Sequence, residues 1–125
     1  MFNSCSSLTS ITIGKGVTTI GNIAFSNCSK LENINVSDKN ANYSSIEGIL
    51  YNKRQTTMIM VPRATKEIEV PNTVTKIENY AFYNCDNLEI ITIGDSVTDI
   101  EIEEVSFYNC SKLKSIDVSN NCLLY

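Results

Sequence analysis

The sequence contains no histidine and no tryptophan, and only 19% of its 125 residues carry charge. The absence of histidine removes the commonest general base of enzymes and the commonest metal ligand. No glycine-rich phosphate-binding loop is present, and no motif places a base beside any of the serines. The sequence therefore predicts no catalytic residue, no cofactor and no enzymatic activity.

Strong charge of one sign and long apolar runs are also missing. Ten basic and 14 acidic residues give a net charge of −4 without a basic cluster, and such a surface is repelled by phosphate backbones and anionic lipid headgroups. No apolar run approaches the roughly 20 residues that a membrane-spanning helix needs. We expect neither nucleic-acid binding nor direct membrane insertion.

What the sequence has instead is an internal repeat, built on 42% hydrophobic residues. A phenylalanine is followed by a cysteine three residues later and a leucine six residues later in four copies, which begin at Phe2, Phe25, Phe82 and Phe107. Each leucine is followed by Ile or Val three and five residues later. The first two copies are 23 residues apart, the last two are 25 apart, and the middle pair is 57 apart.

Units of this length bury too little apolar surface to fold alone, so they stack on copies of themselves. The Leu-x-x-Ile-x-Ile segment alternates with period two, as a strand with one buried face does, and a fixed repeat makes such strands parallel. A Val-Thr-x-Ile step begins at Val17, Val74 and Val97 and predicts a second short strand. The Ala-Phe-x-x-Cys stretch predicts a short helical or 3₁₀ turn.

The runs Ala24-Phe25-x-x-Cys28-x-x-Leu31 and Ala81-Phe82-x-x-Cys85-x-x-Leu88, with the strands that follow them, resemble the BspA-like leucine-rich repeats. That family occurs on surface proteins of host-associated bacteria and some parasitic protozoa, and the resemblance covers essentially the whole chain. It implies a leucine-rich-repeat solenoid of the α/β horseshoe class, mostly parallel β with short helical or 3₁₀ turns. The last copy departs from the pattern, because Ser106 replaces the usual alanine.

One repeat, about residues 37–70, is longer than the others. Two β-prone runs at 44–51 and 57–61 flank a polar turn at 52–56, which predicts a β-hairpin, and 67–70 then returns to the stack. Both ends of the sequence fall inside a repeat without a capping unit. We therefore expect residues 1–125 to form a single solenoid that is truncated at both ends, with possible end-to-end self-association of the uncovered coils.

The repeat-position cysteines, Cys5, Cys28, Cys85 and Cys110, predict an inward-facing column of small buried side chains. A metal ion needs ligands that converge on one point, whereas a column spreads them along an axis. Disulfides between neighbouring coils fit a spacing of about 4.8 Å, but side chains that point in parallel pair poorly, so we expect free thiols. We expect no metal site.

The outward positions of the stacked strands form the candidate binding face. These positions are Ser10, Thr12, Asn33, Asn35, Glu67, Glu69, Ile90, Thr92, Ser115 and Asp117. The face is expected to be continuous and polar to acidic, without the aromatic or Arg anchors of tight interfaces, so weak contacts would add up along a longer array. An alternative patch consists of Tyr83 and Tyr108, one coil apart, for which structural packing is the plainer interpretation.

The resemblance implies a non-catalytic protein-binding module of a cell-surface or secreted protein. It further implies adhesion to host matrix proteins, such as fibronectin or fibrinogen, or to other cells. A rigid structural spacer that presents another domain fits the low charge and the regular Ser, Thr and Asn faces equally well. Fold alone does not choose between these two functions.

Overall fold

The computed structural model describes residues 6–21, 24–25, 28–94, 99–102, 110–118 and 123–124. These residues form strands and turns, and none of them lies in a helix. The strands are β1 (Ser10–Ile13), β2 (Asn33–Val36), β3 (Tyr43–Ile46), β4 (Ile49–Asn52), β5 (Thr57–Met60), β6 (Glu67–Val70), β7 (Lys76–Ile77), β8 (Ile90–Ile93), β9 (Asp99–Ile102), β10 (Ser115–Val118) and β11 (Leu123–Leu124).

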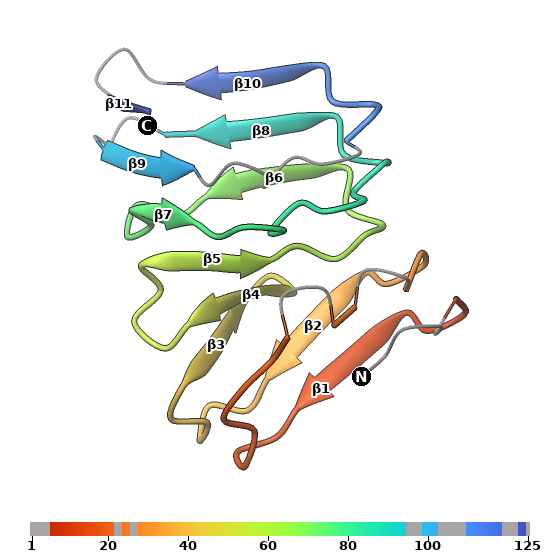
Figure 1. Ribbon diagram of the computed structural model, residues 1–125, viewed down its shortest axis with the longest axis vertical. Coiled ribbons are helices and arrows are strands. Elements are labelled where there is room, and N and C mark those ends of the chain that lie inside the picture. The colour runs from red at the N-terminus through yellow and green to blue at the C-terminus, as the bar shows by residue number, and fades with distance from the viewer. Residues whose placement is uncertain are drawn as a thin grey trace.

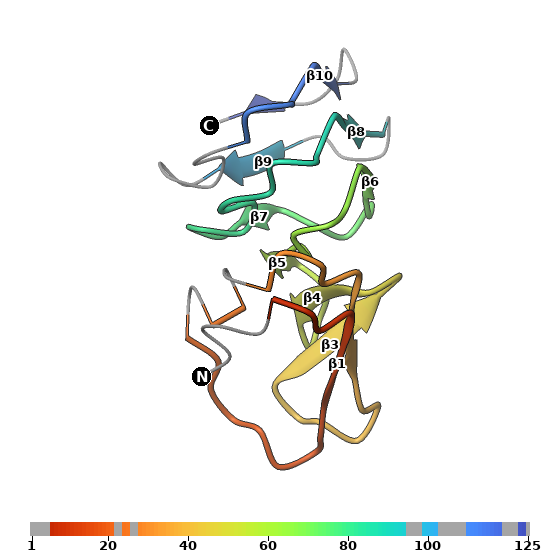
Figure 2. The same ribbon diagram turned by 90° about the vertical axis from the view of Figure 1, so that its right-hand side faces the viewer.

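Strands at corresponding repeat positions stack in parallel. β1 pairs with β2, and β8 lies between β6 and β10, so that Ile91 is in register with Ile68 on one side and Ile116 on the other. β5, β7, β9 and β11 stack in parallel as a second column. The two columns lie on different sides of the stack (Figures 1 and 2), and the chain winds between them. The predicted leucine-rich-repeat solenoid is confirmed.

The predicted alternation places Ile11, Ile34, Ile68 and Ile91 of β1, β2, β6 and β8 inside the solenoid, whereas Ile116 of β10 is 38% exposed. β1 and β6 both alternate exposed and buried residues, starting from an exposed one. Ile34 and Ile91 are completely buried, and their parallel neighbours Ile11 and Ile68 are 6% exposed. Stacking thus supplies the apolar contacts that a single coil lacks.

The Ala-Phe-x-x-Cys segments form successive single turns with the hydrogen bonds of a 3₁₀ turn, and none of the described residues lies in a helix. Near Phe82, backbone N–H groups of Ala81, Cys85 and Leu88 each donate to the carbonyl three residues earlier. Tyr80 and Asn84 have φ of 65° and 58°. Such left-handed residues interrupt the run of right-handed φ that a helix requires.

The Val-Thr-x-Ile prediction holds for two of the three units. The second and third copies contain β7 and β9, which pair in parallel with each other. The first copy, Val17 to Ile20, contains no strand. Side chains bind its backbone instead, because the Ile20 N–H donates to the hydroxyl of Tyr43 (3.1 Å) and the Val17 carbonyl accepts from the amide of Asn40 (3.0 Å).

The long repeat contains the predicted hairpin, β4–β5, and a second hairpin, β3–β4, which we did not predict. Glu47 and Gly48 form the two-residue turn of that second hairpin, with φ of 52° and 82°. Two positive φ values in succession are typical of the tight hairpin turn that favours glycine. The signal for it is the Glu47-Gly48 pair, which divides the β-prone run 44–51 into two strands.

Strands β4 and β5 separate two hydrophobic cores. Leu50 and Met60 contact the amino-terminal core around Phe25 and Ile34. Ile49, Tyr51 and Met58 belong to the carboxy-terminal core around Phe82 and Ile91. Because both faces of β4 are covered, three of its four residues are buried, and the long repeat acts as a partition between the cores.

The expected burial of the repeat-position cysteines is found where the structure describes them. Cys28 and Cys85 are buried free thiols, and Cys110 is a partly buried free thiol. The Cys85 thiol donates to the Val61 carbonyl (Sγ to oxygen 3.6 Å), and the Cys110 thiol donates to the Phe82 carbonyl (3.1 Å). Cys5 and Cys122 lie outside the described residues.

Candidate binding surface

The amino-terminal part of the candidate face is neutral and polar. Ser10 and Thr12 of β1 lie in register with Asn33 and Asn35 of β2, and all four side chains are exposed. The Asn35 amide donates to the Ser10 hydroxyl at 3.3 Å. This pairing is local to the sheet surface and leaves the hydrogen-bonding capacity of the other side chains to solvent or a partner.

The carboxy-terminal part of the face is acidic. Glu67, Ile90 and Ser115 lie in one row across β6, β8 and β10, and Glu69, Thr92 and Asp117 lie in the next. The three acidic side chains are exposed, whereas the other three residues are partly buried. Among the described residues, no ion pair engages Glu67, Glu69 or Asp117.

The charges of Glu89 and Lys114, which directly precede β8 and β10, are paired, in contrast to those on the strands. The Lys114 ammonium lies 2.7 Å from the carboxylate of Glu89, one coil below it. This hydrogen bond lowers the pKa of Glu89 and raises the pKa of Lys114. The acidic residues without an ion pair in this region are therefore the strand residues Glu67, Glu69 and Asp117, and not Glu89.

The two parts of the face are not continuous, so that expectation is wrong. β2 and β6 do not pair, and Figure 1 shows that β2 runs obliquely to β6. The segments that precede β2 and β6 are still hydrogen-bonded to each other, because the Ala64 N–H donates to the Leu31 carbonyl (2.9 Å). Farther along, the β3–β4 turn takes the place of the next coil, since the Ile34 N–H donates to the Gly48 carbonyl (2.8 Å).

A cleft of about 300 Å³ lies at this interruption. Its lining combines β6 and β8 with the β3–β4 turn and consists of Glu47, Ile49, Thr65, Glu67, Ile68, Glu69, Ile90 and Thr92. Four of these residues belong to the predicted face. Sequence reasoning missed Glu47, because its position depends on the unpredicted hairpin.

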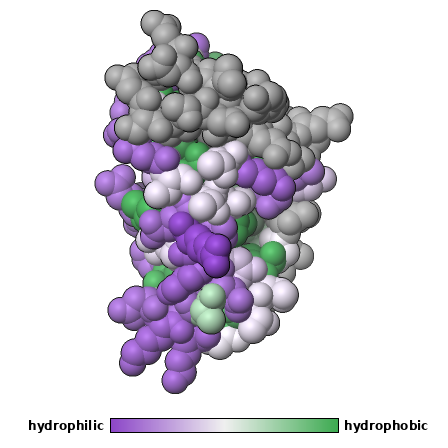
Figure 3. Space-filling model, turned by 90° about the vertical axis from the view of Figure 1, so that its left-hand side faces the viewer, coloured by the Kyte–Doolittle hydropathy of each residue, from purple (hydrophilic) through white to green (hydrophobic). Residues whose placement is uncertain are grey.

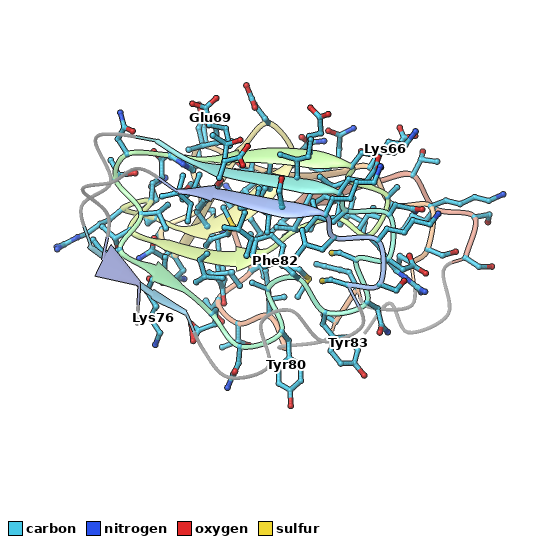
Figure 4. All side chains as sticks on the ribbon, turned by 90° about the horizontal axis from the view of Figure 1, so that it is seen from above. Lys66, Glu69, Lys76, Tyr80, Phe82 and Tyr83 are labelled. Carbon is cyan, nitrogen blue, oxygen red and sulfur yellow. The ribbon has the colours of Figure 1, made fainter. Side chains whose placement is uncertain are left out.

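The predicted patch of Tyr83 and Tyr108 is described at Tyr83 alone. The ring of Tyr83 meets the ring of Tyr80 edge to face, with centroids 5.3 Å apart, and Tyr108 lies outside the described residues. Figure 4 looks down the stack. Lys66 and Glu69 project on the side of β6, and Tyr80 and Tyr83 project on the opposite side. Phe82 lies between them in the interior. Packing of neighbouring turns thus accounts for part of the tyrosine surface.

A second cleft and the hairpin tip are two further features of the described surface. The second cleft is lined by Arg63, Asn84, Asp86 and Ser111, and Arg63 already donates to the Asn84 carbonyl (2.9 Å). At the tip, the ammonium of Lys53 donates to the Asp38 carbonyl (3.0 Å). Figure 3 shows the side that lies on the left in Figure 1, which is mainly hydrophilic where it is described.

The buried thiols carry no feature of a reactive site. Burial raises the pKa of Cys85 far above its ordinary value, and it raises the pKa of Cys110 to about 11. A reactive cysteine requires the opposite shift. No group of three or more Cys, Asp or Glu side chains among the described residues could hold a metal ion, and no described helix is suited to crossing a membrane.

Comparison with solved structures shows the same fold in bacterial proteins. The pneumococcal vaccine antigen PcpA shares 23% identity over 92% of this chain, with a TM-score of 0.76. A leucine-rich repeat protein from Eubacterium ventriosum shares 26% identity over 94% (TM-score 0.66), and a leucine-rich cell surface protein from Faecalibacterium prausnitzii shares 22% over 91% (TM-score 0.59). The chain spans 28%, 37% and 48% of the lengths of these three proteins.

No curated protein matches the chain by sequence. The family model for the BspA-type leucine-rich repeat region, described as having six copies, matches residues 1–67 and 62–124. These matches extend over nearly the whole sequence and agree with the parallel stack and with the fold of the solved structures. The chain belongs to the family of BspA-type leucine-rich repeat proteins.

Proposed function

We propose that this chain is a non-catalytic protein-binding module of a cell-surface or secreted protein, and that it adheres to host matrix proteins or to other cells. The observation that carries the proposal is the outward strand surface, whose polar and acidic side chains recur between paired coils in each of its two parts, without ion pairs at Glu67, Glu69 or Asp117 among the described residues. Extended repeat-built faces are the usual binding surfaces of solenoids.

The relatives support a surface location by their descriptions. One solved structure is a leucine-rich cell surface protein and another is a vaccine antigen. Because this chain spans less than half of either protein, their properties extend to it as an inference about one segment. Weak contacts over such a segment would be multiplied along a longer array through effective concentration.

The test is binding of the immobilised chain to fibronectin, fibrinogen and other matrix proteins at several salt concentrations. The acidic part of the face should set the salt dependence, so Glu67→Lys with Glu69→Lys should change the binding of a responsive partner. A matched control, Glu32→Lys with Asp38→Lys, reverses two exposed charges away from the strand face. Equal effects of the two double variants would place the binding site elsewhere.

The alternative function is a rigid structural spacer that presents another domain. One observation favours it, because the ten outward residues include no Trp, Tyr, Phe or Arg, the residues on which tight interfaces usually centre. A chain that binds no matrix protein or cell surface would favour the spacer. Saturable binding that responds to the glutamate reversals would favour the adhesive module.

A further inference from the structure

The edge of β6 that faces away from β8 is open. Among the described strands, β8 pairs with β6, and no Cα atom of β6 lies within 8 Å of a Cα atom of β2, β3, β4 or β5. The facing edge of β2 is covered, because the Ile34 N–H donates to Gly48 and the Val36 N–H donates to the Ser45 hydroxyl (3.0 Å). The hairpin therefore covers one edge of the interruption and leaves the other exposed.

The backbone groups at the open edge can be assigned. The Lys66 carbonyl accepts from the Glu89 N–H (2.8 Å), so it points towards β8. Successive residues of a strand direct their backbone groups to opposite edges, which places the N–H and C=O groups of Glu67 and Glu69 at the open edge. No described backbone hydrogen bond outside the β6–β8 ladder involves either residue. An exposed row of this kind is a template for another strand.

The cleft along this edge determines the chemistry of its occupant. Three acidic residues with exposed side chains, Glu47, Glu67 and Glu69, line it, together with Ile90, which is partly buried and apolar. The basic side chain nearest in sequence, Lys66, contributes instead to lowering the pKa of Glu89 on the β8 side. A volume of about 300 Å³ is at the lower end of ligand pockets and suits a short peptide segment.

We propose that the open edge of β6 binds an extended peptide segment with alternating basic side chains, which adds to the sheet as a strand. Its backbone pairs with the N–H and C=O groups of Glu67 and Glu69, and its Lys or Arg side chains lie against the cleft carboxylates. The backbone supplies affinity and the alternate side chains supply specificity. This inference rests on the proposed protein-binding function and names the class of partner.

The first experiment measures amide hydrogen exchange in the full chain by NMR. In the free protein the amides of Glu67 and Glu69 should exchange quickly, whereas that of Ile68, within the β8 ladder, should be protected. An acetylated and amidated hexapeptide of alternating lysine and valine should protect both glutamate amides on binding. Protection of the glutamate amides in the free chain equal to that of Ile68 would overturn the inference, because the edge would then be paired.

The second experiment separates strand addition from simple charge attraction. Two further peptides carry N-methyl groups on all the lysines or on all the valines. One edge of an added strand pairs with β6, so one methylated peptide should bind about tenfold more weakly or worse, and the other should keep most of its affinity. Equal affinities for the two methylated peptides, whether both are reduced or both retained, would overturn strand addition.

The acidic rim is tested with charge-neutral variants of the same shape. Glu67→Gln with Glu69→Gln should weaken binding of the lysine–valine peptide about fivefold or more at low salt. Asp38→Asn, an exposed carboxylate outside the cleft, should not. Thermal unfolding of each variant verifies that the fold is retained. Equal affinities of both variants for the peptide would overturn the assigned charge complementarity.

The outcomes separate this inference from the proposed function. A chain that binds a matrix protein but not the lysine–valine peptide would overturn strand addition and leave adhesion standing. Peptide binding with protected Glu67 and Glu69 amides, but without binding to any matrix protein or cell, would support the strand site and overturn adhesion.

Discussion

At the residue scale, Asn40 is the buried polar side chain that organises the first coils. It is 1% exposed, and its amide nitrogen donates to the carbonyls of Gly14 (2.8 Å) and Val17 (3.0 Å). Its amide oxygen accepts from the N–H groups of Asn42 (2.8 Å) and Tyr43 (2.9 Å). The Asn40 side chain therefore links the backbone of residues 14–17 to the start of β3.

Replacing Asn40 by alanine should destabilise the chain by about 2 kcal/mol or more, because the substitution leaves buried backbone donors and acceptors without partners. Asn35→Ala is the matched control. That asparagine is exposed on β2, and its loss should change stability by no more than about 0.5 kcal/mol. Chemical denaturation followed by circular dichroism measures both values, and equal effects would contradict the structural role of Asn40.

The buried ionisable groups predict loss of stability at alkaline pH. Burial raises the pKa values of Cys85 and Tyr51 and brings the pKa of Cys110 to about 11, against an ordinary thiol value of 9.0. A raised pKa means that the folded state holds its proton more tightly. The stability from these groups is therefore complete below the pKa values of the unfolded chain and is lost as pH rises through the values of the folded chain.

The urea midpoint should accordingly be constant near neutrality and should fall as pH rises from about 9 towards 11. In a Cys85→Ala, Cys110→Ala double variant the initial fall between about pH 9 and 10 should be smaller, since the thiols ionise before tyrosine. An undiminished fall in that variant would assign the alkaline transition to other groups.

At the element scale, the β3–β4–β5 segment is shaped by its two turns. Asn52 closes the second turn, because its amide oxygen accepts from the N–H groups of Thr56 (2.9 Å) and Thr57 (3.1 Å). Gly48 closes the first turn at a φ of 82°. A Cβ atom at Gly48 would lie 2.5 Å from Oδ1 and 3.1 Å from Cα of Asn33. Backbone conformation and close approach to β2 therefore both require glycine.

Gly48→Ala should destabilise the chain by more than about 1 kcal/mol, through the positive φ and the contact with Asn33. Gly16→Ala is the control, because nothing lies within 4 Å of its added Cβ and its φ is not positive. Thermal unfolding of the two variants measures the difference in stability between them. A neutral Gly48→Ala would mean that the β3–β4 turn does not sit against β2.

At the scale of the whole molecule, stacked coils supply one another's cores, and the long repeat joins the two halves. Leu50 contributes to the amino-terminal core, and its neighbour Tyr51 contributes to the carboxy-terminal one. Solenoid stability is approximately a sum over units and their nearest-neighbour interfaces. Because β4 is shared by both cores, disruption of either core should weaken the other through this strand.

Ile91 lies at the centre of the β6–β8–β10 sheet and is completely buried. Ile91→Asp should cost about 4 kcal/mol or more, since it buries an unpaired charge. Thr92→Asp introduces the same side chain one residue away on the outward face and should leave the chain folded. Circular dichroism and urea denaturation compare the two variants, and a folded, stable Ile91→Asp would refute the register of β8.

The repeat, the parallel stack and the side of each strand that is buried can all be predicted from the sequence. These properties follow from local spacing, because a period of two residues fixes which side chains share a face and a constant repeat fixes the register. The free thiols of Cys28, Cys85 and Cys110 follow from the same rule. The turns near Phe82 do not follow from local spacing, because the left-handed φ values of Tyr80 and Asn84 have no counterpart in the hydrophobic pattern.

The segment that lies beside β2, in contrast, is set by the packing of the folded chain. The next coil by sequence position is 67–70, but the β3–β4 turn occupies its place, and this inserts Glu47 into the candidate site and opens the edge of β6. A hydrophobic pattern predicts which face of a strand is buried. It does not predict which segment of the chain pairs with the backbone of that strand. That choice depended on the packing of Leu50 and Tyr51 into two separate cores, a non-local property that no window of sequence contains.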